Sequence, residues 1–306
     1  MPILRLNSAA DGPQVHGSPY SWQSELKKLP YHRPIIIMLH GYKFFPGHPV
    51  HCPHNHILSL KRAPQFSRAF SWPLAMGLEK NHTSGLAFGW PARGSLQSAF
   101  DRAHQAGYDL AHVISQLKKM APQRPIHIIA HSLGVRVAIA ALKLLAFGSV
   151  DRIITIAGAE FYCAVMQTLE TPAGKSAEII NIASSENSLF DFLLQKLIWP
   201  DHAGDIAMGR HIPKRGNFTS LWIDNPKVLE GLRQAGFNIA APRQKICHWS
   251  GYIRPGIFDF YAACLCRPQE ILINRIKMIA AMVDQSALNS KLKKVKKISL
   301  TPLRQQ

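Results

Sequence analysis

A serine at a predicted sharp turn is the residue best placed to do chemistry. Ser132 lies in Ala130-His131-Ser132-Leu133-Gly134, directly after the short apolar run 126–130 and before a long helical pattern. A strand, a small-x-Ser-x-Gly turn and a helix in this order expose the serine hydroxyl at the edge of a sheet, where the helix N-terminus favours developing negative charge. The pattern predicts that Ser132 is a nucleophile; a plain helix cap is the alternative interpretation.

A serine hydroxyl needs a histidine to take its proton. In strand–serine–helix folds this histidine comes late in the chain, after the acid that orients it. His248 ends the last β-like run, 243–248, and Gly251 and Pro255 then break the pattern. We therefore predict that His248 is the general base.

The third group should be a carboxylate that follows a strand between the serine and the histidine. Glu186 comes just after the predicted strand 178–183 and is the predicted acid. Asp191, about one helical turn further on, is the reserve, and Glu160 after the preceding strand is a further alternative.

A second strand end predicts an oxyanion hole. His40-Gly41-Tyr42 follows the apolar run 35–39, and such an early loop supplies one backbone N–H while the residue after the nucleophile supplies the other. The predicted donors are the amides of Tyr42 and Leu133. A plain strand-ending turn is the alternative interpretation of the first segment.

Short β-branched runs alternate with helical patterns along the middle of the chain, which is typical of a mainly parallel sheet covered by helices on both faces. Predicted strands are 35–39, 86–89, 126–130, 152–157, 178–183 and 243–248, and predicted helices are 96–117, 135–147 and 270–283. We expect one domain over 1–285, with long loops 42–85 and 190–242 as the walls of a substrate pocket.

The formal net charge of +18 is unusual for a chain of 306 residues. Part of it lies in a basic C-terminal tail, 286–306, which carries six Lys or Arg and no acid. Such a tail is expected either to stay solvated, which is the simpler interpretation, or to make weak contact with anionic lipid or nucleic acid.

Other sequence features predict a cytoplasmic protein that needs neither cofactor nor metal. We see no secretory signal and no apolar run long enough for a transmembrane segment, and the five cysteines are scattered and odd in number. The series His48, His51, His54 and His56 suits zinc by residue type, but several prolines and no carboxylate accompany it. A loop that lines the substrate pocket is the favoured interpretation.

Three segments in this order, Ile36-Ile37-Met38-Leu39-His40-Gly41-Tyr42, Phe88-Gly89-Trp90-Pro91 and Ala130-His131-Ser132-Leu133-Gly134, resemble a mostly uncharacterised bacterial branch of the α/β-hydrolase superfamily. The resemblance covers about 34–252. It implies the α/β-hydrolase fold and a Ser–acid–His triad, with Glu186 at the position of an aspartate.

The predicted activity is hydrolysis of an ester or related acyl bond in a small-molecule substrate through an acyl-enzyme, and acyl transfer would use the same groups. The alternative is a catalytically idle hydrolase scaffold that binds an anionic partner through its basic surface or tail.

Overall fold

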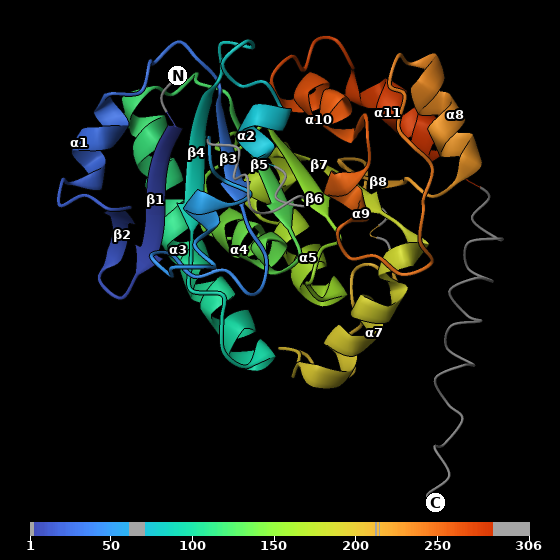
Figure 1. Ribbon diagram of the computed structural model, residues 1–306, viewed down its shortest axis with the longest axis horizontal. Coiled ribbons are helices and arrows are strands. Elements are labelled where there is room, and N and C mark those ends of the chain that lie inside the picture. Colours follow the sequence, from blue (N-terminus) through green and yellow to red (C-terminus); the bar gives the residue numbers. More distant parts are fainter. Residues whose placement is uncertain (1–2, 61–70, 212, 214, 284–306) are drawn as a thin grey trace, which may run out of the picture.

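The computed structural model describes residues 3–60, 71–211, 213 and 215–283. They form an eight-stranded sheet with the order β2-β1-β4-β3-β5-β6-β7-β8, drawn in Figure 1. Only β1 and β2 pair antiparallel; the other neighbours are parallel. The strands are β1 Ile3–Ala9, β2 Gly12–Val15, β3 Ile35–Leu39, β4 Ser84–Gly89, β5 Ile126–His131, β6 Arg152–Ile156, β7 Glu178–Ala183 and β8 Phe218–Trp222. The predicted α/β-hydrolase fold, mainly parallel and covered by helices, is confirmed.

Two apolar cores lie on opposite faces of the sheet, because side chains alternate along each central strand. In β3, Ile35, Ile37 and Leu39 face one core while Ile36 and Met38 face the other. The first core is closed by α1 Trp22–Lys27, α3 Leu96–Met120, α4 Leu133–Leu142, α5 Tyr162–Leu169 and α6 Pro172–Ser176. The second is closed by α2 Trp72–Ala75, α8 Pro226–Gln234, α9 Ser250–Ile253, α10 Ile257–Leu265 and α11 Ile273–Ala280. Burial on both faces explains why the central strands are apolar throughout.

The long loops contain short elements of their own. Trp72 of α2 and the 3-10 turn η1 Pro53–Asn55 lie within the first loop. The second contains α7 Ser188–Leu197, β8 and α8. In Figure 1, α7 lies at the lower edge of the molecule, and its Leu194 is buried in the first core.

Residues 243–248 form a loop, so the predicted strand there is wrong. Arg243 to Ile246 are all exposed, and a strand in a covered sheet would bury them. The last strand is β8, inside the segment that we expected to be a loop. Its sequence Phe-Thr-Ser-Leu-Trp has a strand-like composition and lies between Gly216 and the Asn225-Pro226 helix start.

None of the helices within the described ranges is long and apolar enough to cross a membrane. The basic tail 286–306 lies outside the described residues.

Gly107 sets the distance between α3 and α4. A Cβ atom on Gly107 would lie 2.4 Å from the Cβ of Ala140 and 3.0 Å from the carbonyl oxygen of Val137. The glycine thus permits close packing of α3 on α4. Since α4 starts just after Ser132, this packing also holds the nucleophile turn in place.

We predict that Gly107→Ala destabilises the fold by up to about 2 kcal/mol. Overpacking of a tight core costs about 1–3 kcal/mol, and the better helix propensity of alanine returns about 1 kcal/mol at most. Urea denaturation measures the change. Gly216→Ala is the matched control because a Cβ there meets nothing within 4 Å. Equal denaturation midpoints for both variants would contradict the packing argument.

Candidate active site

Ser132 occupies a strained turn between β5 and α4. Its φ is 53° and its ψ is −124°, a combination that residues with a side chain rarely adopt. Three backbone hydrogen bonds hold it: its amide donates to Ile156 (3.0 Å), and its carbonyl oxygen accepts from Val135 (3.0 Å) and Ala159 (3.1 Å). The turn directs the serine side chain beyond the end of β5, as the sequence pattern predicted.

Two glycines allow the neighbouring chain to approach this turn closely. A Cβ on Gly134 would lie 2.5 Å from the carbonyl oxygen of His40, and a Cβ on Gly41 would lie 2.8 Å from the Cβ of Ser132. The absence of side chains at both positions places the peptide that follows Gly41, which carries the Tyr42 amide, beside the serine. Leu133 is the first residue of α4, and the first amides of a helix have no acceptor within it. Both predicted oxyanion donors thus belong to chain segments that adjoin Ser132, since Tyr42 follows Gly41 and Leu133 follows Ser132 itself.

His40 holds the loop that carries Tyr42. Its Nε2 accepts from the Trp90 amide at 3.0 Å, so its Nδ1 carries the proton and donates to the Gly41 carbonyl oxygen at 2.9 Å. The Trp90 indole N–H donates to the carbonyl oxygen of His40, and the two rings stack. Complete burial lowers the pKa of His40 to about 4, so the ring is neutral near pH 7.

His248 is brought to Ser132 from 116 residues further along the chain. Its Nε2 lies 2.9 Å from Ser132 Oγ, and its Nδ1 lies 2.7 Å from Oδ1 of Asn187. An amide oxygen only accepts, so Nδ1 carries the proton and Nε2 presents its lone pair to the serine hydroxyl. The ring of Phe190 stacks on the imidazole at 4.5 Å. Burial keeps the pKa of His248 well below its usual value of 6.5, which favours the neutral form that can take a proton.

His131 supports the histidine loop rather than acting on the serine. Its ring is buried, Nε2 donates to the carbonyl oxygen of His248 at 3.1 Å, and the ring meets the edge of Tyr252. Burial lowers the pKa of His131 to about 4, so a second positive charge beside His248 is avoided.

The predicted acid, Glu186, does not contact His248. Its carboxylate forms a buried ion pair with Arg254 and accepts from the Ser184 hydroxyl at 2.9 Å. Arg254 also donates to the carbonyl oxygen of Ile223 at 2.5 Å, so the pair ties the end of β7 to the start of α10. Glu186 faces this arginine because it lies one residue before the end of the 3-10 turn η2 Ser185–Asn187, and it is Asn187 that faces the histidine.

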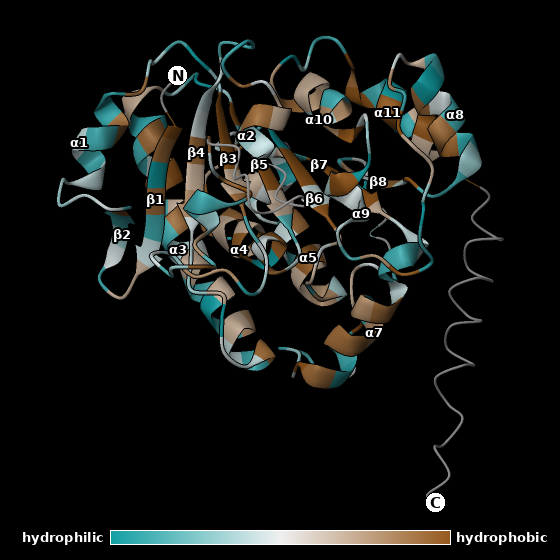
Figure 2. Cartoon of the chain, in the orientation of Figure 1, coloured by the Kyte–Doolittle hydropathy of each residue, from teal (hydrophilic) through white to brown (hydrophobic). Residues whose placement is uncertain are grey.

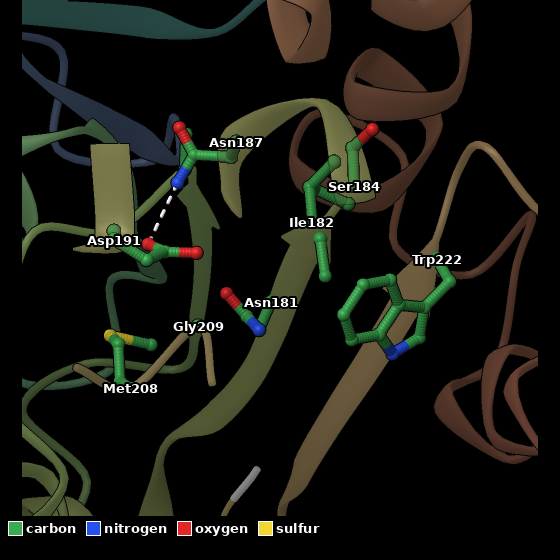
Figure 3. A pocket seen from close by; sticks show the side chains of 11 residues that line it. Asn181, Ile182, Ser184, Asn187, Asp191, Met208, Gly209 and Trp222 are labelled. Carbon is green, nitrogen blue, oxygen red and sulfur yellow. Dashed lines mark hydrogen bonds between the residues drawn. The ribbon is translucent and has the colours of Figure 1, made fainter. Parts of the chain in front are cut away.

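Asn187 is the residue that the sequence prediction missed. It caps α7, and its Nδ2 donates to Oδ1 of Asp191 at 2.9 Å, as Figure 3 shows. The reserve acid Asp191 is thus connected with His248 by two hydrogen bonds, through the side chain of Asn187. Asn187 follows the same strand end as Glu186 and lies one helical turn before Asp191, but the predicted third group was restricted to carboxylates.

The carboxylate of Asp191 is buried. Gly209 packs against it so closely that a Cβ there would lie 2.6 Å from Oδ2. Burial raises the pKa of Asp191 to about 7, while the Arg210 charge and the Asn187 amide favour its ionised form and oppose the shift. A small cavity of about 20 Å³, room for about one water molecule, adjoins Asn187 and Asp191 and is lined also by Asn181 and Trp222.

Glu160, the remaining alternative, forms a different pair. Arg136 of α4 donates to both of its carboxylate oxygens at 2.9 and 3.1 Å, and the arginine also lies over the ring of Phe100. Burial raises the pKa of Glu160, and the arginine opposes this. The pair fastens the loop after β6 to α4 and takes no part in the contact between Ser132 and His248.

The histidine-rich loop is held by local contacts. His54 Nε2 lies 2.7 Å from Asn7 Oδ1, its ring packs on His16, and His48 Nδ1 accepts from the amides of Val50 and His51. Within the described part of the chain, no group of three or more His, Cys, Asp or Glu could hold a metal ion.

Comparison with known proteins agrees with the fold. Residues 19–164, just under half of the chain, match the model of a family described as "Alpha/beta hydrolase of unknown function (DUF900)". The matched segment includes Tyr42 and Ser132 and ends before Asn187 and His248. A search of curated proteins gives no match.

Several solved structures are similar over part of the chain. The catalytic core domain of an acetyl xylan esterase from Trichoderma reesei is 11% identical and covers 50% of this chain and 84% of its own, with a TM-score of 0.31. A putative cell surface hydrolase from Lactobacillus plantarum WCFS1 is 15% identical over 66% of this chain and 90% of its own, with a TM-score of 0.34. An acylaminoacyl peptidase from Pyrococcus horikoshii is 14% identical over 57% of this chain and 33% of its own, with a TM-score of 0.28. These scores are too low to carry an argument about chemistry.

We predict that Glu186→Gln lowers the stability of the protein by about 3 kcal/mol, because it leaves the buried Arg254 guanidinium without a counter-charge. Chemical denaturation measures the change. The control is Glu230→Gln, which removes an exposed pair with Arg233 and should leave the denaturation midpoint unchanged. If Glu186→Gln abolished turnover without a loss of stability, Glu186 would be acting on His248 after all.

Proposed function

We propose that this chain, which belongs to the α/β-hydrolase superfamily, hydrolyses an ester or related acyl bond with Ser132 as nucleophile and His248 as general base. The observation that carries the proposal is the contact of 2.9 Å between Ser132 Oγ and His248 Nε2, at a strained turn after β5. A serine held in this conformation with a neutral imidazole on its hydroxyl is the arrangement that acyl transfer requires.

The reaction follows from the positions of these groups. Ser132 Oγ attacks the carbonyl carbon while its proton passes to His248 Nε2. The amides of Tyr42 and Leu133 donate to the oxyanion that forms. When the tetrahedral intermediate collapses, the leaving alcohol takes the proton from Nε2. Water then attacks the acyl-enzyme while His248 Nε2 takes a proton from it, and the proton passes to Ser132 Oγ when the acid product leaves. Transfer to an acceptor other than water would use the same groups.

Asn187 takes the place of the triad acid in this proposal. Its Oδ1 accepts from Nδ1–H of His248, which fixes the tautomer and the ring orientation and stabilises the imidazolium through the amide dipole. A neutral asparagine in this place serves cysteine–histidine proteases of the papain type.

Asp191 acts as a positioning residue behind Asn187. An ionised carboxylate only accepts, so it binds the Nδ2 end of Asn187 and forces Oδ1 to face His248. A protonated Asp191 can instead donate to Oδ1. Asn187 is then free to turn its NH₂ group toward Nδ1, which would move the histidine proton to Nε2 and block the base.

We predict that Ser132→Ala abolishes both esterase activity and labelling by a fluorophosphonate probe. Loss of the nucleophile costs about 10⁶-fold in kcat in a comparable enzyme. The measurements are hydrolysis of p-nitrophenyl esters of varied chain length and the stoichiometry of labelling. Ser98→Ala, at an exposed serine of α3, is the control and should behave as wild type. Folded wild-type protein that takes no label would favour the idle scaffold instead.

We predict that kcat/KM rises with pH through about 7, because the pKa of Asp191 is about 7 and its ionised form is the one that orients Asn187. His248 does not set this limb, since its pKa lies well below 6.5. In Asp191→Asn the limb near pH 7 should disappear. The high-pH plateau of kcat/KM should fall at least ten-fold. The upper limit is a fall of about 10⁴-fold, which is the cost of a wrong histidine tautomer.

Asp101→Asn is the control for this experiment, because Asp101 is exposed on α3 and bonds only to Gln97 among the contacts described. A lower plateau with an unchanged pH limb in Asp191→Asn would show that Asp191 serves only the packing of α7.

A further inference from the structure

Apolar side chains are exposed on the outer face of α7, next to the candidate active site. Leu189, Leu193 and Leu197 are exposed at a spacing of four residues, so they form one stripe along the helix. Trp199 follows directly and is 83% exposed. Figure 2 shows α7 as a largely hydrophobic helix at the lower edge of the molecule.

A second exposed segment lies against the start of this helix. Ile246 and Trp249 are 54% and 50% exposed and flank His248. The Cys247 amide donates to the Glu186 carbonyl oxygen at 3.1 Å, and the His248 ring stacks on Phe190 of α7. The loop that carries Ile246 and Trp249 therefore contacts the first turn of α7 beside His248, and we treat the exposed apolar residues of the two segments as one surface. We name this surface the docking face and define it by its six exposed apolar residues, Leu189, Leu193, Leu197, Trp199, Ile246 and Trp249.

Three of the exposed charges beside the docking face are positive, and one exposed acid, Asp201, follows Trp199 by two residues and pairs with Arg136 at 3.4 Å. Lys196 lies on α7, and Arg243 and Lys245 precede Ile246; all three are exposed. The two acids of the segment 186–199, Glu186 and Asp191, are buried and turned inward. Exposed leucines and tryptophans with lysine and arginine at their edge are the composition of helices and loops that lie in the headgroup region of an anionic membrane.

Charge complementarity favours lipid over other partners. The whole chain carries a formal net charge of +18, and a basic surface is attracted to the negatively charged headgroups of anionic lipid. Nucleic acid would also attract the charge, but it offers nothing to bury three leucines of a helix, whereas the acyl chains of a bilayer do.

We propose that the docking face binds the surface of an anionic phospholipid bilayer and that the substrate is an acyl ester taken from that surface. The binding step rests on the exposed residues and their charge alone; the choice of substrate rests also on the proposed function. With α7 on the membrane, an ester at headgroup depth lies next to Ser132 and His248, and its acyl chain can stay in contact with apolar side chains while the carbonyl group reacts.

The test is sedimentation of the full chain, as Ser132→Ala to prevent turnover, with phosphatidylcholine vesicles that contain either half phosphatidylglycerol or none. We expect binding to the anionic vesicles that weakens steeply with salt. The triple variant Leu193→Asn, Leu197→Asn, Trp199→Ser should bind them at least ten-fold more weakly. The matched control, Leu144→Asn with Phe147→Ser, removes exposed apolar side chains after α4 and should bind like the parent.

Three outcomes overturn the proposal. The first is equal binding by the triple variant and the control, and the second is an absence of binding to both kinds of vesicle, which would point to a protein partner. The third is binding lost only when the six Lys and Arg residues of the tail are changed to Gln. Failure of the catalytic proposal looks different: vesicle binding persists, while the wild-type protein, which keeps Ser132, hydrolyses no ester.

The triple variant made in the wild-type background should hydrolyse the soluble ester p-nitrophenyl acetate at the wild-type rate.

Discussion

The backbone of Ser132, held at a positive φ between β5 and α4, is the constraint on which the rest of the site depends. Such a conformation costs about 1–3 kcal/mol and persists only where the surroundings fix it. Here the amide is tied to β6, the carbonyl oxygen to α4 and to the loop after β6, and glycines 41 and 134 let the end of β3 close over the turn. Close packing of α4 on α3 at Gly107 then fixes the helix that starts at the turn.

Buried neutral histidines position this site by hydrogen bonding without adding charge. His40 holds the loop that carries Gly41 and Tyr42, His131 holds the main chain of His248, and burial keeps the pKa of each near 4. If either ring were charged near pH 7, it would repel the imidazolium that forms on His248 during the proposed reaction. Desolvation therefore serves the chemistry here as much as the packing does.

Elements with strong periodicity could be predicted from the sequence, and those whose role is decided by tertiary contacts could not. The central strands near Ser132 are apolar throughout, and the long helix α3 has apolar residues at steps of three and four. These patterns predicted both kinds of element with small errors at their ends. The run 243–248 has β-like residues but no neighbouring strand, while β8 was hidden in a segment with many loop-forming residues.

Ser132 and His248 meet as expected because chain order and strand ends bring them together. The third position was missed because a one-residue step at the end of β7 turns Glu186 toward Arg254 and Asn187 toward His248, and no local signal distinguishes the two directions.

The two faces of α7 connect the candidate site with the protein surface. Its inner face carries Asp191, which holds Asn187, and Phe190, which stacks on His248; its outer face carries the three leucines. The inner face also buries Leu194 in the first core, so the position of the helix sets the position of Asn187 beside His248. An asparagine–aspartate pair suits such a helix, because its geometry depends on one hydrogen bond of 2.9 Å within the first turn of α7. If the outer face rests on a membrane, the surface that would supply the substrate also restrains the helix that orients the base.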